Sequence, residues 1–528
     1  MTSSARLPPQ PGEELDRTTT LKFTWGGHPY HGYAGDTIAS ALAAAGIGVF
    51  SRSVKYHRPR GLMTATFHDP GCTVQVGDEP NVRGAHRRLE SGMDVRPQNA
   101  WPSLQHDVKA ANQLAGRFLG AGFYYKTFIR PRRLWPAYQK VLSRFAAGGT
   151  VRAGDAPDRF DQRYAHVDVC VAGGGPAGIA AAIGAAASGA RVLLVDEEYR
   201  LGGHLRYGSP SELAALAELR AALAAHDNVE VLANSVVAGR YDDNWLAVVE
   251  RQPTATGGGD RTDGAVFERL VKVRAGALVA APGLVERPYV FEGNDAPGVL
   301  LSTAVRRLVN LWAVRPGERA VVLSANPEGD AAVEDLRRAG VDVTRVVDAR
   351  RGGDVLRAET SGRGEHRRLR RVTLAGGQRI ECDLLVTAVG WTAPTMLLNL
   401  AGDRPEFSSV ANRFVPGGRA HASVLATGGL AGDGSLEALV EHGRATGREA
   451  ASRATGGSPA AIPLLAVVAH PACFRARTHG MVDFSEDVSS KDIASAAAEG
   501  FDSIELVKRF TTATMGPAQG KLETVNLV

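Results

Sequence analysis

The stretch from Val167 to Leu205 constrains the fold more than any other, because it combines a glycine-rich turn with strand and helix signals in the right order. It reads VDVCVAGGGPAGIAAAIGAAASGARVLLVDEEYRLGGHL, with an apolar run, Gly173-x-Gly175-x-x-Gly178, an alanine-rich segment and a second apolar run that ends in Asp196. Gly173 permits a tight turn, Gly175 lets the backbone approach a pyrophosphate, and Gly178 allows close packing of helix on sheet. We therefore predict a βαβ unit that binds a dinucleotide at the N-terminus of its helix.

The residues after the second apolar run indicate which nucleotide is bound. Asp196 is expected to accept hydrogen bonds from ribose hydroxyls, and Glu197 and Glu198 follow it instead of an arginine that would bind a 2′-phosphate. NAD, FAD or another adenine nucleotide is therefore favoured over NADP. The predicted cofactor-binding residues are Gly173, Gly175, Pro176, Ala177, Gly178, Asp196, Glu197, Gly202, Gly203, Gly283, Gly390, Gly428 and Asp433.

Composition bounds the class of protein. The 528 residues are enough for about three or four domains, and 44% hydrophobic with 22% charged residues is ordinary for a globular protein. The four cysteines are far apart and form no CxxC, which argues against a disulfide framework or a zinc site and fits a reducing cytoplasm. The sequence shows no signal peptide and no run of 18 apolar residues, so we expect no membrane span. The arginines are scattered, so the net charge of +5 does not predict a nucleic-acid partner.

Further patterns predict an α/β fold with α+β appendages. A second βαβ pattern begins at Arg319, with a degenerate turn Ser324-x-Asn326-x-x-Gly329. We expect two interleaved Rossmann-like domains, an N-terminal ferredoxin-like β-grasp domain and a small C-terminal helical module. The predicted segments are a disordered arm (1–18), the β-grasp domain (19–95), a wrapping connector (96–160), the first part of the FAD/NAD-binding domain (161–316), the second Rossmann-like domain (317–390), the remainder of the first (391–455), and a linker with the helical module (456–528).

Several longer motifs carry a family resemblance. RSVKYHRPRG (52–61), LVERPYVFEGNDAPGV (284–299) and VDFSEDVSSKDIASAAAEGFDSIELVKRFTTATMGPAQGK (482–521) resemble the alpha subunit of heterotetrameric sarcosine oxidase and the large subunits of proline and opine dehydrogenases and of hydrogen cyanide synthase. The resemblance implies an oxidoreductase acting on CH-NH donors. It also implies a smaller FAD-containing beta subunit, further small subunits, and an FMN shared with the partner.

In that family the beta subunit oxidises sarcosine or a similar N-methyl amino acid, so no residue of this chain is assigned a catalytic role. The basic segment Lys55, His57, Arg58 and Arg60 is the candidate for an FMN phosphate clamp or an interface contact, and a surface salt-bridge loop is the alternative. Three other interpretations stay open: an opine, proline or cyanide-forming complex, a non-catalytic scaffold subunit, and a self-sufficient NAD(P)H-dependent flavin reductase. The replacements at Ser324 and Asn326 oppose the last of these, because it would need an intact second glycine-rich turn.

Two departures from the family affect these expectations. Cluster-bearing relatives carry cysteines at positions that here are Val482, Phe484, Ala518 and Glu523, and the N-terminal domain has only Cys72. We therefore expect no iron–sulfur cluster, because thiolates hold such clusters. The sequence ends at Val528, where that family continues into a folate-binding aminomethyltransferase domain; that domain is expected to be encoded separately, absent or truncated.

Overall fold

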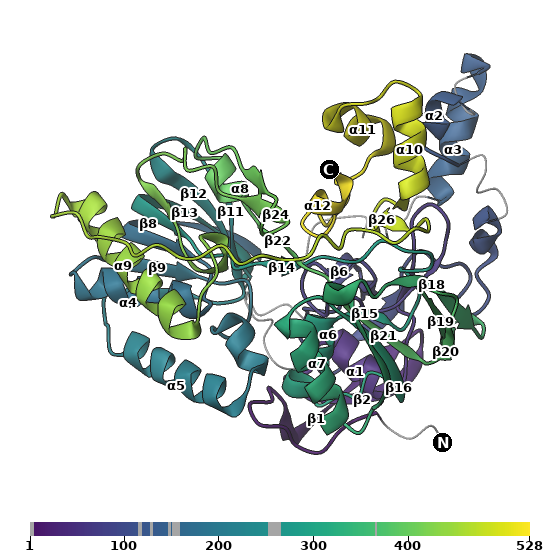
Figure 1. Ribbon diagram of the computed structural model, residues 1–528, viewed down its shortest axis with the longest axis horizontal. Coiled ribbons are helices and arrows are strands. Elements are labelled where there is room, and N and C mark those ends of the chain that lie inside the picture. The colour runs from purple at the N-terminus through teal and green to yellow at the C-terminus, as the bar shows by residue number, and fades with distance from the viewer. Residues whose placement is uncertain are drawn as a thin grey trace. The chain divides into compact units, whose positions relative to one another are not determined.

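The computed structural model describes residues 5–113, 119–126, 130–145, 149, 159–251, 266–364 and 367–528 (Figure 1). The chain divides into two compact units. The first comprises residues 1–154, 286–390 and 471–528, and the second comprises residues 155–285 and 391–470. One Rossmann-like domain is therefore interrupted in sequence by another, as the two βαβ patterns predict.

A seven-stranded sheet forms the centre of the second unit. Its order is β10-β9-β8-β13-β12-β11, and β25 also pairs with β13. The parallel strands are β8 (Arg159–Ala172), β9 (Val192–Val195), β10 (Val229–Leu232), β13 (Val266–Ala280) and β25 (Val424–Ala426), and the antiparallel ones are β11 (Ser235–Arg240) and β12 (Trp245–Arg251). Apolar runs at residues 245–252 and 269–273 around three glycines predict a hairpin inserted into the sheet, and the antiparallel pairing of β12 with β13 confirms it. Its glycine turn at 257–259 lies outside the described residues.

The apolar runs of this sheet are buried on both faces. Val169 and Val171 of β8 pack into one core with helices α4 (Pro176–Ala187), α5 (Pro210–Ala224) and α9 (Leu436–Thr455). Their neighbour Cys170 packs into the core on the opposite face, which includes α8 (Met396–Asn399). Continuous hydrophobic runs are typical of such doubly covered parallel strands. The sheet therefore positions the turn after β8 between two packed layers.

The first unit contains the second Rossmann-like domain. Its parallel sheet has the order β15-β21-β16-β17, and a three-stranded antiparallel sheet β18-β19-β20 is inserted before β21. The elements are β15 (Val299–Leu301), α6 (Ser302–Trp312), β16 (Arg319–Ser324), α7 (Pro327–Arg338), β17 (Asp342–Asp348), β18 (Val355–Ser361), β19 (Arg368–Leu374), β20 (Arg379–Glu381) and β21 (Leu384–Ala388). The predicted strand, helix and strand from Arg319 onward are confirmed.

The N-terminal domain of the first unit is a five-stranded sheet with one helix. The strand order is β2-β1-β7-β5-β6. Two short strand-like runs around Gly26-Gly27 predict a hairpin here, and this glycine pair joins β1 to β2. Thr37 caps the helix through a reciprocal bond pair with Ser40. The elements are β1 (Asp16–Trp25), β2 (His28–Ala34), α1 (Ile38–Ala44), β3 (Ser51–Arg52), β4 (Pro59–Arg60), β5 (Thr73–Val76), β6 (Glu79–Arg83) and β7 (Asp94–Pro97).

The rest of the first unit is mainly helical. The connector contains α2 (Phe123–Lys126) and α3 (Trp135–Phe145), and the C-terminal module contains β26 (Met481–Asp483), β27 (Val488–Ser489), α10 (Ser490–Ala498), α11 (Ile504–Thr511) and α12 (Thr524–Leu527). Residues 491–499 and 504–510 are predicted as two helices from the sequence, and α10 and α11 confirm them. None of the helices in the described part of the chain combines the length and the apolar character needed to cross a bilayer.

Three predicted boundaries differ from the structure. The predicted arm is ordered from residue 5, because Arg6 pairs with the buried carboxylate of Asp36 and Leu7 donates a backbone hydrogen bond to Ala313. Residues 286–316 belong with the second Rossmann-like domain and not with the first, because β15 pairs with β21. Residues 456–470 belong with the second unit and not with the C-terminal module. The apolar run at residues 277–281, which the sequence predicts as a strand of its own before Pro282, lies at the end of the longer strand β13.

Candidate nucleotide site

The glycine-rich turn joins the end of β8 to the beginning of α4. Gly173 has φ +117°, and a Cβ on it would lie 2.1 Å from the Ala281 carbonyl oxygen. A Cβ on Gly178 would lie 1.9 Å from the Gly173 carbonyl oxygen. Gly175 is the N-cap residue of α4, and no side chain makes a capping hydrogen bond there. Pro176 and Ala177 begin the helix. The first and third glycines are therefore required by the fold, and the helix N–H groups have no side-chain acceptor at the N-cap.

The middle glycine faces open space. An ideal Cβ on Gly175 meets no heavy atom within 4 Å, and its φ of −69° is ordinary for any residue. The Gly202-Gly203 pair lies against the turn: Gly202 N donates to the Gly174 carbonyl oxygen at 2.7 Å, and a Cβ on Gly203 would approach Gly175 Cα to 3.1 Å. This cradle fits a phosphate group that approaches the backbone at Gly175.

Asp196 lies at the end of β9, beside the same turn. One carboxylate oxygen accepts a hydrogen bond from Gly174 N, and the other accepts one from Glu198 N at 2.8 Å. Burial raises the pKa of Asp196 to about 6, although both hydrogen bonds act in the opposite direction. The Glu198 carboxylate pairs with the buried guanidinium of Arg206 at 2.9 Å, and Glu197 is partly exposed next to Asp196. The acid predicted to bind ribose therefore also holds the turn.

Other predicted residues follow the ends of neighbouring parallel strands. Gly283 follows β13, has φ +69° and faces open space. Gly428 follows β25, and a Cβ on it would lie 3.1 Å from Ala177 Cβ at the start of α4. Asp433 ends the same turn, and its carboxylate is already bound by Arg413, which the sequence did not single out. Gly390 belongs to the first unit, after β21, so its cofactor role stays a prediction.

The second βαβ turn is filled by the chain's own side chains. Asn326 caps α7 by accepting from Gly329 N, and Ser324 Oγ donates to Asp330 at 2.7 Å. Glu328 and Asp330 lie in the first helical turn, and a hydrogen bond from Arg350 lowers the pKa of Asp330. Both carboxylates have arginine partners, since Glu328 pairs with Arg306 at 2.8 Å and Asp330 with Arg350 at 2.8 Å. Negative charge in the first turn of a helix opposes the binding of an anionic phosphate there.

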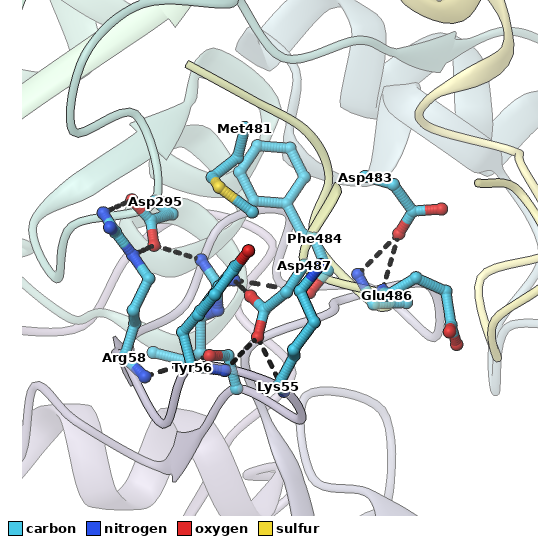
Figure 2. A network of polar contacts seen from close by, with 12 residues as sticks. Lys55, Tyr56, Arg58, Asp295, Met481, Asp483, Phe484, Glu486 and Asp487 are labelled. Carbon is cyan, nitrogen blue, oxygen red and sulfur yellow. Dashed lines mark hydrogen bonds and ion pairs between the residues drawn. The ribbon is translucent and has the colours of Figure 1, made fainter. Parts of the chain in front are cut away.

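The basic segment of residues 55–60 lies in a network of buried ion pairs within the first unit (Figure 2). Arg58 binds the Asp295 carboxylate with two nitrogens at 2.6 and 2.5 Å, and Arg60 binds the same carboxylate at 2.5 Å. Arg60 also pairs with Asp487. Burial acts against ionisation of Asp295, but Arg60 and Arg58 hold its pKa below the usual range.

The same network fixes the backbone of the basic segment. Lys55 N and Tyr56 N donate to Asp487 at 2.9 and 3.0 Å (Figure 2), and buried His57 contacts Asp107 at 3.1 Å. Both partners of the arginines, Asp295 and Asp487, lie in motifs that carry the family resemblance. Arg60 and His57 are buried, so the loop is an internal ion-pair loop and not one confined to the surface. No contact here tests an FMN or interface role, which stays a prediction.

Three family profiles match the chain. They are described as a 2Fe-2S iron-sulfur cluster binding domain at residues 18–100, an FAD dependent oxidoreductase at residues 168–269, and a sarcosine oxidase A3 domain at residues 477–528. The first and third correspond to the predicted ferredoxin-like domain and C-terminal module. The second covers the glycine-rich turn and Asp196.

The match at residues 18–100 contradicts the expectation of no iron–sulfur cluster, because that family is defined by cluster binding. Plant-type clusters of this kind use the cysteine spacing C-x4-C-x2-C. Counting back from Cys72, this spacing falls on Asp69 and Thr64. The buried Asp69 carboxylate accepts backbone hydrogen bonds from Met63, Thr64, Ala65 and Gly71. Of these three positions only Cys72 carries a thiol.

In the C-terminal module, the four positions that carry cysteines in cluster-bearing relatives are all buried: Val482, Phe484, Ala518 and Glu523. Burial and the nearby Asp483 raise the pKa of Glu523 to about 8.

Curated relatives extend over the whole chain. It is 37% identical to the alpha subunit of sarcosine oxidase from Rhizobium meliloti (strain 1021), covering 100% of this chain and 56% of the relative. It is 29% identical to the alpha subunit of sarcosine oxidase from Corynebacterium sp. (strain P-1), covering 99% and 54%. The chain thus spans about half the length of these relatives. An opine oxidase subunit from Agrobacterium tumefaciens (strain Ach5) is 30% identical over 34% of this chain and 36% of its own length.

A solved structure supports the fold. L-proline dehydrogenase from P. horikoshii aligns with a TM-score of 0.68 at 18% identity, covering 98% of this chain and 93% of that one. At this identity the likeness shows the architecture alone. This chain is therefore similar over its whole length to sarcosine oxidase alpha subunits, and its C-terminal module matches the sarcosine oxidase A3 domain.

Proposed function

We propose that this chain is the nucleotide-binding large subunit of a flavin-dependent amine oxidoreductase of the sarcosine oxidase type. The observation that carries the proposal is the open cradle above Gly175, beside Asp196, in a chain related over its whole length to sarcosine oxidase alpha subunits. The cradle supports one adenine dinucleotide, NAD or FAD, with its pyrophosphate at the N-terminus of α4.

The chain's own residues bind and orient the nucleotide. Free N–H groups at the start of α4 donate to the pyrophosphate, and Asp196 accepts from the ribose hydroxyls. The second turn, with Asn326, Glu328 and Asp330 in place, takes no part. When bound, such a cofactor supplies redox or structural chemistry that no side chain offers, and the protein supplies geometry.

Amine oxidation is proposed to occur in a smaller FAD-containing partner, within a heterotetrameric enzyme of the cytoplasm. The proposed substrates are sarcosine or a similar N-methyl amino acid. This rests on the relatives, whose names describe subunits of sarcosine oxidase. Lys55, His57, Arg58 and Arg60 remain the proposed segment for the interface, now as a loop held by Asp295 and Asp487.

Two measurements test the proposal. Denaturing the purified chain should release close to one adenine dinucleotide per chain, identified by mass spectrometry. The isolated chain, supplied with sarcosine or dimethylglycine and a dye acceptor, should show no turnover. Turnover by the isolated chain would overturn the proposal that amine oxidation needs a partner, and a chain free of nucleotide that also fails to bind any would overturn the site.

A further inference from the structure

The connector between the N-terminal domain and β8 is strongly basic. Residues 108–154 contain nine lysines and arginines and no aspartate or glutamate, whereas the whole chain has 61 basic and 56 acidic residues. Without these nine, the rest of the chain carries 52 basic against 56 acidic side chains and is therefore net negative. The net positive charge of the protein thus comes from this one connector, and no carboxylate of its own sequence neutralises it.

The part of the connector up to α2 is bound to other parts of the first unit. Tyr56 Oη donates to the Leu119 carbonyl oxygen at 3.2 Å, which joins the connector to the basic segment of residues 55–60. Lys126 of α2 pairs with Glu499 at the end of α10, and Figure 1 shows these two helices next to each other. The positive charge of Lys126 is therefore matched by a carboxylate of the C-terminal module.

The basic residues that follow α2 are not matched in this way. A 3₁₀ turn (Arg132–Leu134) leads into α3, and four basic side chains here are exposed: Arg130, Arg132, Arg133 and Lys140. Within the part of the chain that the structure describes, none of the four has an ion-pair partner. Leu134 and Trp135 beside them are 43% and 37% exposed. We call the exposed surface of residues 130–140 the basic ridge; it combines three unpaired guanidinium groups with apolar area.

The chemistry of the basic ridge fits a protein partner with carboxylates on its surface. An arginine fork binds a carboxylate through two parallel hydrogen bonds, and arginine and tryptophan often carry most of the binding energy at protein interfaces. Pro131 and Pro136 restrict the backbone within the ridge, which reduces the entropy lost on binding. A long polyanion or an anionic membrane would also face the net negative remainder of the chain, which would repel it. A compact acidic patch on a protein needs to contact only the ridge.

We propose that the basic ridge docks on an acidic surface of the smaller FAD-containing subunit. The inference rests on the proposed function, which gives this chain such a partner, and it extends the contact beyond the segment of residues 55–60 to residues 130–140. The hydrogen bond from Tyr56 to Leu119 joins the two parts of this surface within the first unit. Because the docking charges are exposed, salt should weaken the complex.

The test measures the dissociation constant of the complex that forms when this chain and the smaller FAD-containing subunit are co-expressed. Mass photometry after dilution gives this constant at low and high salt, about 50 and about 300 mM NaCl. The constant for the wild type should be at least about tenfold higher at high salt. A wild-type chain that binds no such subunit would overturn the proposed partnership, and the docking surface with it.

A triple charge reversal tests the ridge alone. The combination of Arg130→Glu, Arg132→Glu and Arg133→Glu should raise the dissociation constant at low salt by about 30-fold or more. The helix should stay folded, because these positions precede the N-terminus of α3, where negative charge is favourable. The matched control combines Arg337→Glu, Arg345→Glu and Arg379→Glu, three exposed arginines of the second Rossmann-like domain, and should change the constant by less than about twofold. Equal affinities of the two triple variants would overturn the docking surface while leaving the partnership intact.

Two further measurements separate docking from its alternatives. The combination of Arg130→Lys, Arg132→Lys and Arg133→Lys restores the charge, so it should recover at least about tenfold of the affinity that the glutamates remove. Failure to recover would show that the glutamates act by disturbing the connector and would overturn the proposal. Vesicles of phosphatidylcholine with one-third phosphatidylserine, and a single-stranded oligonucleotide, are the other probes. Binding of the wild-type chain to either one, lost in the glutamate variant, would assign the ridge to another class of partner and overturn the proposal.

Discussion

The two βαβ turns have the same plan of strand, turn and helix, but they differ at the helix N-cap. Gly175 at the first turn has no side chain, makes no cap and faces open space. Asn326 at the second turn caps its helix, and Glu328 and Asp330 follow in the first helical turn. The third glycine packs closely at both turns, since a Cβ on Gly178 or Gly329 would clash.

The difference separates two roles of the glycine pattern. The third glycine serves the packing of helix on sheet and persists where no ligand is expected. The middle glycine leaves helix N–H groups uncapped, which is useful only if another acceptor binds there. An uncapped helix N-terminus facing open space is therefore a better sign of a phosphate site than the glycine spacing alone.

The largest expected effect is at the N-cap of the first turn. Gly175→Val should weaken nucleotide binding more than about 100-fold, the scale of losing several charge-assisted hydrogen bonds. Because the new side chain enters open space at an ordinary φ, the free energy of unfolding should change by less than about 0.5 kcal/mol. Calorimetric titration and urea unfolding measure the two quantities. Unchanged affinity would show that the cradle is not the phosphate site.

The second effect concerns the acid beside that turn. Asp196→Ala removes a ribose acceptor and should weaken binding by about 1.5–3 kcal/mol. It also removes the acceptor of Gly174 N and Glu198 N, so Asp196→Asn, which keeps one acceptor oxygen, should lose less. Titration of the three proteins with NAD measures the series. An Asn variant weaker than the Ala variant would contradict the proposed contact.

Strongly patterned segments could be predicted from the sequence, and long-range partners could not. The glycine turn, Asp196, the interrupted Rossmann order and helices α10 and α11 follow from local spacing and periodicity. The boundary at Glu286 has no local sequence signal, because β15 has only three residues and pairs with the distant strand β21. The partners of Arg58 and Arg60 depend on contacts across more than 200 residues of sequence, which no local pattern encodes.

The third effect is a pH dependence of the first turn. Burial raises the pKa of Asp196 to about 6, above its unfolded value. The raised pKa contributes stability to the nucleotide-free protein below about pH 4, and this contribution of about 2–3 kcal/mol is lost as the pH rises through 6. Ribose hydroxyls donate to the ionised form, so NAD affinity should have the opposite trend.

The NAD dissociation constant should therefore be about tenfold higher at pH 5 than at pH 7. Below the pKa, each pH unit lowers the ionised fraction of Asp196, and with it the affinity, by at most about tenfold. Asp196→Asn supplies the control, because it cannot ionise and its affinity should not change over this range. Calorimetric titrations at both pH values measure the effect. A wild-type affinity that is also independent of pH would show that the ribose does not contact Asp196.

The smallest effect is expected where the second turn is converted toward the first. Ser324→Gly combined with Asn326→Gly restores Gly-x-Gly-x-x-Gly, yet Glu328 and Asp330 keep negative charge in the first turn of α7. Replacing the Asn326 cap by Gly should lower the free energy of unfolding by only a few tenths of a kcal/mol. Loss of the hydrogen bond from Ser324 to Asp330 should lower it by about 0.5–1.5 kcal/mol more. Equilibrium dialysis with labelled NAD in a Gly175→Val background should detect no second site, because uncapping alone does not remove the competing carboxylates. Binding of one equivalent by this protein would show that the cap, and not the acidic side chains, decides between the two turns.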